Sequence, residues 1–205
     1  MLSRVGRPKE HGEQIAAALL AAAERTVEER GIEALSVRGV ATEVGTTTRA
    51  VYSVFGSKDG LLAALGTHAF DMLREGVDGI PRTDDPRGDL IAAGMMFRRF
   101  ATEHPSLFAL GVQGQLPSGA WQDVVPAAQT ALQSLMALVA RLEEPQLLGD
   151  RTVPEATLEF HALCEGLAAI ELRRFARVSD SERIWRQALA ALVEGFALSA
   201  ARTAG

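Results

Sequence analysis

The sequence predicts an all-α protein of about nine helices, because its apolar residues recur every three or four positions and no segment alternates as a strand would. Alanine and leucine, which favour helices, are plentiful, whereas runs of β-branched residues are missing. Glycine and proline divide the chain into segments of helical length. We expect a three-helix, helix-turn-helix domain over residues 1–57 and a second helical domain over residues 58–205.

The first predicted helix covers about residues 10–30, where Ile15, Leu19 and Val27 share one face and Gly31 ends the helix. Two short helices are expected next, the first capped by Ser36 and the second by Thr46 or Thr47, and Ser57 caps a longer one. This longer helix is expected over about 58–76, and further helices over about 89–103, 126–142, 154–177 and 180–201.

Three aspartates lie at the end of the turn-rich segment 79–89. Carboxylates in a loop have no fixed geometry, so Asp84, Asp85 and Asp89 do not predict a site. A solvated turn in which Asp89 caps the following helix accounts for them.

The composition predicts a cytoplasmic protein. The chain has one cysteine, Cys164, which cannot form an internal disulfide. No stretch of about 18 apolar residues occurs, so we expect no transmembrane helix. The net charge of −5 argues against a nucleic-acid ligand, but residues 1–60 carry as many basic as acidic side chains, and both lysines of the chain, Lys9 and Lys58, fall there.

The segment 36–55, SVRGVATEVGTTTRAVYSVF, has the pattern of a helix-turn-helix. Val37, Val40 and Ala41 form an apolar stripe on its first short helix, and Gly45 supplies the turn. The second helix can enter the DNA major groove while the first braces it across the backbone.

The exposed face of the second helix carries hydroxyls and a guanidinium but no acid. Arginine can bond guanine, threonine can bond bases or touch a thymine methyl, and tyrosine and lysine commonly contact phosphates. The alternative is a solvated polar face without a binding function, because short helix–glycine–helix segments occur in many helical proteins. The spacing alone leaves both interpretations open.

Residues 15–65 resemble the DNA-binding domain of the TetR family of bacterial repressors. The matching segments are ALSVRGVATEVG (34–45) and AVYSVFGSKDGLLAAL (50–65). The chain departs from the family pattern at Thr46, usually an apolar residue, and at Val54, often a histidine.

The resemblance implies base contacts from Thr47, Thr48, Arg49 and Ser53, and phosphate contacts from Tyr52, Arg38 and Lys58. A basic N-terminal arm of Arg4, Arg7 and Lys9 is expected either to enter a minor groove or to be a solvated tail. The complete predicted DNA-binding set is Arg4, Arg7, Lys9, Ser36, Arg38, Thr46, Thr47, Thr48, Arg49, Tyr52, Ser53 and Lys58.

The remainder resembles the family's C-terminal ligand and dimerisation domains more loosely, through FRRFATEHPSLFAL (97–110) and FHALCEGLAAIELRRF (160–175). That resemblance implies a homodimer in which the last two helices pair with their copies as a four-helix interface. The alternative is that their apolar stripes face the core of one subunit. The predicted interface set is Leu158, Gly166, Ala169, Ile170, Arg173, Trp185, Leu189, Leu192, Val193 and Phe196.

A group of soft apolar side chains predicts a pocket for a bulky apolar ligand, although filling of the core would also explain them. His161 and Cys164 are expected to line this pocket. Together with Glu165 they have a helical spacing that could hold a metal, but a core histidine and a buried thiol explain it better, and we expect no metal or cofactor. The predicted pocket set is Met72, Met96, Phe97, Phe100, Phe108, Trp121, His161 and Cys164.

The sequence predicts a regulator and not an enzyme, because no phosphate loop, zinc motif or redox cysteine pair occurs. We expect a repressor that an apolar ligand releases from a palindromic operator, and activation by ligand stays open. The alternatives are a helical ligand-binding or interaction protein without DNA binding, and a small helical enzyme.

Overall fold

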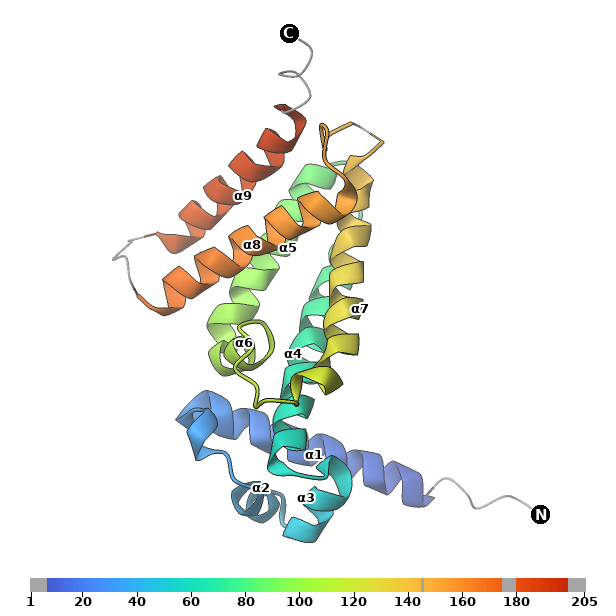
Figure 1. Cartoon of the computed structure of the whole chain (residues 1–205), viewed down its shortest axis with the longest axis vertical. Helices are drawn as coiled ribbons and strands as arrows, with labels where there is room; N and C mark the ends of the chain where they lie inside the picture. The colour runs from blue at the N-terminus through green and yellow to red at the C-terminus, as the bar shows by residue number, and fades with distance from the viewer. Residues whose placement is uncertain (1–6, 145, 175–179, 199–205) are drawn as a thin grey trace, which may run out of the picture. The chain divides into compact units, whose positions relative to one another are not determined.

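The computed structural model describes residues 7–144, 146–174 and 180–198 (Figure 1). These residues form only helices and their connections, which confirms the all-α prediction and its expected number of helices. None of the described helices is long and apolar enough to cross a membrane. The elements are α1 (Arg7–Arg30), η1 (Ile32–Ala34), α2 (Val37–Val44), α3 (Thr48–Phe55), α4 (Lys58–Asp78), α5 (Pro86–Glu103), α6 (Pro105–Gly111), α7 (Trp121–Val139), η2 (Ala140–Leu142), α8 (Val153–Leu172) and α9 (Ser181–Leu198), where η marks a 3₁₀ helix.

The helices form two compact units that do not follow chain order. The first unit contains the chain up to residue 69 together with residues 106–125, and the second contains residues 70–105 and 126–205. The first unit therefore includes α6 and the start of α7 as well as the N-terminal helices. This grouping differs from the expected boundary at residue 57.

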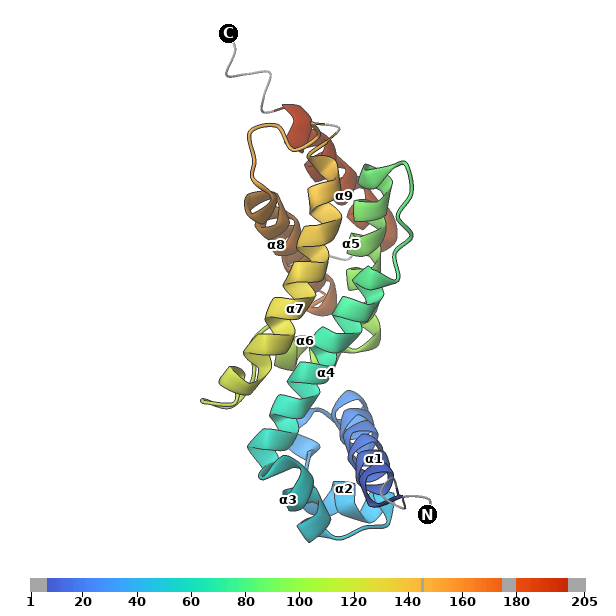
Figure 2. The ribbon, with the colours of Figure 1, turned by 90° about the vertical axis from the view of Figure 1, so that its right-hand side faces the viewer.

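The first unit is built on one buried face of α1. Leu19, Ala22, Ala23 and Val27 lie three or four residues apart on this helix and are fully buried. Both α2 and α3 pack against α1, and Figure 2 shows the three helices grouped together. Because α2 and α3 have eight residues each, their stability depends on this packing.

The second unit is built on α5, against which α8 and α9 pack. Gly94 on α5 allows a close approach, because a Cβ atom at this position would lie 2.6 Å from a methyl carbon of Leu189 on α9. Trp185, Leu189, Val193 and Phe196 of α9 are buried in this core.

One carboxylate joins all three of these helices. Glu171 on α8 accepts two hydrogen bonds from the guanidinium of Arg98 on α5, at 2.7 and 3.1 Å. Its Oε2 also accepts a hydrogen bond from the indole nitrogen of Trp185 on α9, at 2.8 Å. The paired carboxylate raises the pKa of Arg98, so the guanidinium remains charged.

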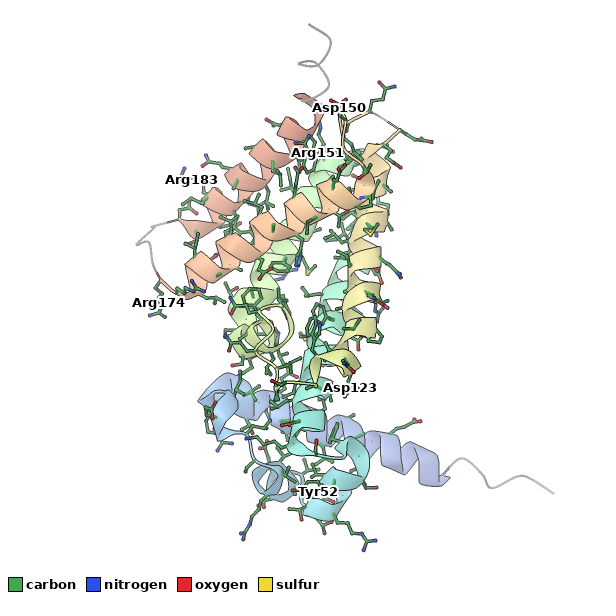
Figure 3. All side chains as sticks on the ribbon, in the orientation of Figure 1. Tyr52, Asp123, Asp150, Arg151, Arg174 and Arg183 are labelled. Atoms are coloured by element: carbon green, nitrogen blue, oxygen red, sulfur yellow. The ribbon has the colours of Figure 1, made fainter. Side chains whose placement is uncertain are left out.

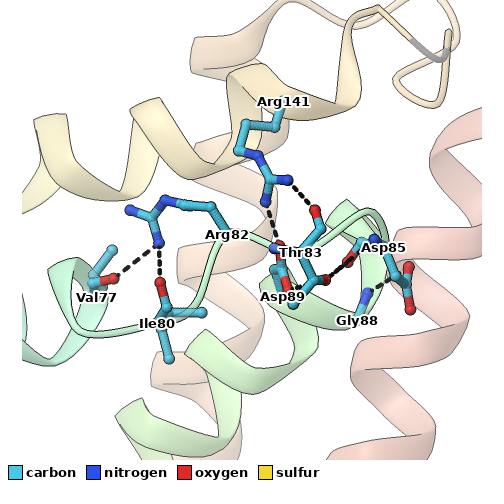
Figure 4. A network of polar contacts seen from close by, with 8 residues as sticks. All are labelled: Val77, Ile80, Arg82, Thr83, Asp85, Gly88, Asp89 and Arg141. Carbon is cyan, nitrogen blue, oxygen red and sulfur yellow. Dashed lines mark hydrogen bonds and ion pairs between the residues drawn. The ribbon is translucent and has the colours of Figure 1, made fainter.

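Asp89 is buried in a polar network and does not cap α5, contrary to the sequence prediction (Figure 4). The helix begins earlier, at Pro86, and its cap is Asp85, whose Oδ1 accepts a hydrogen bond from the Gly88 amide at 3.0 Å. Asp89 instead accepts hydrogen bonds from the amide and hydroxyl of Thr83, at 2.9 and 2.7 Å, and from Arg141 of η2. Arg141 also donates to the Thr83 carbonyl, so one guanidinium of η2 bonds both Asp89 and the loop backbone.

The Asp89 network makes stability depend on pH. Burial alone would raise the pKa of Asp89, but the hydrogen bonds from Thr83 and Arg141 outweigh burial and lower it below the ordinary value. A carboxylate with a lowered folded-state pKa stabilises the fold above its unfolded pKa of about 3.9, and this contribution is lost as the pH falls through the folded-state value.

We expect Asp89→Asn to lower the free energy of unfolding by about 1–3 kcal/mol at pH 7, because the Arg141 guanidinium loses its buried anionic partner. Urea unfolding at pH 7 and at pH 3 measures this effect, and the difference from the wild type should shrink at the lower pH. The exposed neighbour Asp84→Asn is the matched control and should leave stability nearly unchanged. Equal loss in both variants would show that the network contributes nothing specific.

Candidate nucleic-acid interface

The first helix of the motif, α2, is capped by Ser36 as predicted. Ser36 has extended backbone angles, and its hydroxyl accepts a hydrogen bond from the Gly39 amide at 3.1 Å, which satisfies one free donor at the helix start. Val37, Val40 and Ala41 are buried, whereas Arg38 points to the exposed side. The apolar stripe predicted on this helix is therefore the surface that packs inward.

Gly45 forms the turn between α2 and α3 with left-handed backbone angles, φ 72° and ψ 31°. The Gly45 amide donates to the carbonyl of Thr42 at 3.1 Å, and the Thr46 amide donates to that of Ala41 at 2.8 Å. This pair of bonds closes the carbonyl end of α2. Only glycine adopts such angles without a steric cost, so this residue fixes the direction in which α3 leaves.

The second helix, α3, is capped by Thr47, whose hydroxyl accepts a hydrogen bond from the Ala50 amide at 3.2 Å. This decides the cap that the sequence left open between two threonines. Val51 is fully buried and anchors the helix to the core. Tyr52, labelled in Figure 3, is 52% exposed. The exposed residues of α3 are Thr48, Arg49, Tyr52, Ser53 and Val54.

The exposed face of α3 contains one cation and no acid. Glu43 on α2 precedes α3, and its carboxylate is paired with the Arg25 guanidinium of α1 at 2.7 Å. Asp59 follows α3 in the first turn of α4. Arg38 and Lys58 lie on either side of the motif with exposed side chains. The surface of the motif therefore presents positive charge and hydroxyls, which is the chemistry that phosphates and base edges accept.

The structure places the other residues of the predicted DNA-binding set as follows. Thr46 is half-buried in the turn, and Arg4 lies outside the described residues. Arg7 and Lys9 belong to α1, which begins at Arg7, about one turn before the expected start. Sequence reasoning assigned no contact to Val54, although it is 41% exposed on α3 beside Ser53. The helical spacing of the segment already places Val54 on the exposed side of this helix.

Two family models match the chain. Residues 19–65 match the bacterial regulatory proteins of the tetR family, and residues 90–192 match the tetracyclin repressor-like C-terminal domain. The second match alone covers about half of the chain. The chain belongs to the tetR family.

Relatives of this tetR-family protein include HTH-type transcriptional regulators of Mycobacterium tuberculosis and Mycobacterium bovis. Each is 32% identical over 110 residues, which are 52% of this chain and 47% of the relative. The match thus spans about half the length of these curated relatives. The first family model and these relatives point to a DNA-binding regulator.

Solved structures share the fold over most of the chain. A Rhodococcus sp. RHA1 protein of unknown function superposes with a TM-score of 0.81 at 24% identity, over 93% of this chain and 99% of that chain. The TetR family transcriptional regulator PfmR of Thermus thermophilus gives 0.63 at 21%, over 85% and 96%. FadR of Bacillus subtilis, solved in complex with stearoyl-CoA, gives 0.71 at 15%, over 87% and 98%.

The residues predicted to line a pocket are divided between the two units. Phe108 and Trp121 belong to the first unit and the other six to the second. Within the second unit Phe97 and His161 meet edge to face, with ring centroids 5.8 Å apart. The Met96 side chain fills the space beside Gly76, where a Cβ atom would lie 2.4 Å from its sulfur.

On α8, Cys164 is buried and His161 is half-buried. Burial lowers the pKa of His161, although the nearby Glu165 opposes this, so the neutral imidazole is favoured. Burial raises the pKa of Cys164 to about 12, so the thiol stays protonated. No three histidine, cysteine or acidic side chains gather into a possible metal site within the described part of the chain.

The residues predicted for a dimer interface differ in burial, and Leu192 of α9 is half-buried. Four side chains of α9 serve the core of the second unit and are buried within one subunit: Trp185, Leu189, Val193 and Phe196. On α8 the members are accessible, and Leu158 and Ile170 are 67% and 51% exposed. Gly166 lies between them, with nothing within 4 Å of the position of a Cβ atom.

We expect Gly45→Ala to lower the free energy of unfolding by about 1 kcal/mol, because alanine is strained at a positive φ. No atom lies within 4 Å of the position of the added Cβ, so the cost comes from the backbone alone. Urea unfolding measures the change.

The matched control is Gly12→Ala within α1, where a Cβ atom also meets nothing within 4 Å but φ is ordinary for a helix. This substitution should leave stability unchanged or raise it by up to about 1 kcal/mol. A neutral Gly45→Ala would contradict the role of this residue in directing α3.

Proposed function

We propose that this protein is a DNA-binding transcriptional regulator that inserts α3 into the major groove of an operator. The observation that carries the proposal is the exposed face of α3, which has hydroxyls and one guanidinium and no acid, on a helix anchored through Val51. Membership of the tetR family supports it. The chemistry of this face matches what DNA base edges and phosphates accept.

We assign some side chains of the motif to contacts with bases and others to contacts with phosphates. Thr48, Arg49 and Ser53 stand on the exposed side of α3 and are the proposed base readers, with Arg49 suited to guanine. Tyr52, Arg38 and Lys58 are the proposed phosphate contacts. Thr47 positions the others, because its hydroxyl is used as the cap of α3.

The proposed assembly is a homodimer joined through the exposed face of α8. Leu158 and Ile170 would bury their side chains against the partner, and Gly166 would allow a close backbone approach between them. Two α3 helices related by a twofold axis would match the half-sites of a pseudo-palindromic operator. The buried residues of α9 support this surface from within the subunit and do not contact the partner.

The proposed role is that of a repressor released by a small, largely apolar ligand bound in the second unit, near the contact of Phe97 and His161. A neutral imidazole beside an aromatic ring suits an apolar ligand with one polar group. FadR, which shares the fold, was solved with stearoyl-CoA, and this supports an apolar ligand in this architecture. The ligand must distinguish the two states by a few kcal/mol to release the operator.

The experiment that tests the function is a titration of the purified protein against the DNA upstream of its own gene, at two salt concentrations. Tight, sequence-selective binding with a steep dependence on salt would support the regulator and identify the operator. Where that segment gives no selective binding, random duplexes should be screened by selection. A folded dimer that selects no duplex from that pool would contradict the proposal.

We expect Arg49→Ala to relax sequence preference at one base position in each half-site, because a single guanidinium reads a single base pair. Tyr52→Ala should weaken binding to every sequence alike. Competition titrations against single-base operator variants measure both effects. Arg99→Ala, an exposed arginine on α5, is the control and should change neither, whereas full preference in Arg49→Ala would refute the assignment.

We expect Ile170→Arg to weaken the dimer by about tenfold or more, because it places a charge in the apolar face of α8. Sedimentation over a range of concentrations measures the dissociation constant. Leu132→Arg is the matched control, since Leu132 is 43% exposed on α7 outside the proposed interface. A dimer unaffected by Ile170→Arg would place the interface elsewhere.

A further inference from the structure

One flank of α3 is apolar, although the rest of its surface is polar. Residues four positions apart lie on the same side of a helix, so the side chains of α3 that reach the surface form three rows. These rows are Thr48 and Tyr52, Arg49 and Ser53, and Ala50 and Val54. Every side chain of the first two rows carries a hydroxyl or a guanidinium, whereas the third row carries only methyl groups.

Val54 is the accessible member of the apolar row. Both α1 and α2 pack against α3, yet the Val54 side chain is 41% exposed, whereas Ala50 is half-buried. The helix ends one residue later, at Phe55, and Gly56 then turns the chain with φ 74°. The two methyl groups of Val54 are therefore accessible at the carboxyl end of α3.

The Val54 side chain is also held in a defined position. The fully buried Val51 anchors α3 to the core, and a valine in a helix strongly prefers one rotamer because it is branched at Cβ. The methyl groups of Val54 therefore point in a fixed direction. Little side-chain entropy is lost when such a group is buried against a partner, which suits a specific apolar contact.

In the DNA major groove a valine side chain matches one chemical group. Valine has no side-chain donor or acceptor, whereas the base edges present donors and acceptors together with a single apolar group, the C5-methyl of thymine. Burial of methyl groups against that methyl removes apolar surface from water. Valine against another base edge would deprive a polar atom of water without replacing its hydrogen bond, which is unfavourable.

We propose that Val54 is a specificity-determining residue that selects thymine in the operator through contact with its C5-methyl group. The inference rests on the proposed function, because it requires α3 to lie in the major groove. Val54 and Arg49 are five residues apart, which is about 7.5 Å along the helix axis and exceeds the spacing of about 3.4 Å between base pairs. The two side chains therefore contact different base pairs of one half-site.

Removal of single methyl groups from the operator tests this contact. In the duplex identified by titration or selection, deoxyuridine replaces each thymine in turn, and uracil pairs as thymine does but lacks the C5-methyl group. For the wild-type protein we expect one position in each half-site at which uracil raises the dissociation constant about fourfold, as expected for one buried methyl group. Selective binding without any such position would overturn the inference and leave the proposed function intact.

The variant Val54→Ala assigns the methyl effect to this residue. Alanine is a good helix former and Val54 is exposed, so the variant should fold normally. The readout is the ratio of the dissociation constants for the uracil and thymine duplexes, which a general loss of affinity does not change. We expect this ratio to fall to about one. A ratio equal to that of the wild type would overturn the assignment, because another residue would then contact the methyl group.

Two control variants separate the contact from general effects on binding. Ser53→Ala alters the adjacent proposed base reader and should weaken binding while the ratio stays at the wild-type value. Leu132→Ala shortens a comparably exposed apolar residue, 43% exposed on α7, and should change neither quantity. Loss of the uracil effect in Ser53→Ala would overturn the assignment, since any change on α3 would then abolish it.

A second arm distinguishes the methyl group from the remainder of the thymine base. At the sensitive position, a cytosine–guanine pair is compared with the same pair that contains 5-methylcytosine. The wild type should bind the methylated duplex about fourfold more tightly, whereas Val54→Ala should bind both alike. Equal binding of both by the wild type would contradict recognition of a methyl group. If the wild type selects no duplex at all, the proposed function fails and this inference fails with it.

Discussion

The buried face of α1 is the constraint on which the first unit depends. The helices α2, α3 and α6 have eight, eight and seven residues, and isolated helices of this length are not stable in water. They persist because each buries apolar side chains and has its first amides satisfied by a hydroxyl or a carboxylate. Because Val51 packs into this core, the opposite face of α3 is exposed.

The second unit relies on two carboxylates, of which Asp89 is buried and Glu171 is half-buried. Glu171 joins α5, α8 and α9, and Asp89 joins the loop after α4 to η2. Removing a carboxylate from water is costly, so each is matched by an arginine and by further donors that saturate its oxygens. Such contacts specify one arrangement of the helices, because an apolar core alone tolerates small shifts along the helix axes.

The first unit caps its helices in two ways. In the first unit, Ser36 and Thr47 cap short helices from the adjacent residue, so the geometry of the motif is encoded within about twenty residues. Glu28 caps a helix from a distant part of the chain. The local caps at Ser36 and Thr47 set the geometry of the motif. The distant cap at Glu28 instead joins α1 to α6, which follows directly after α5 in the chain.

The sequence by itself determined the helices, the turn at Gly45 and the exposed face of α3, because these follow from periodicity, capping and backbone angles over a few residues. Tertiary structure decided that Asp89 is buried and does not cap α5, since Arg141 of η2, together with Thr83, supplies the donors that make its burial favourable. It likewise divided the apolar residues of α8 and α9 into core and surface, and it brought Glu28 to Ser106. These outcomes depend on contacts between distant segments, and a local pattern in the sequence contains no information about which partner a side chain will meet.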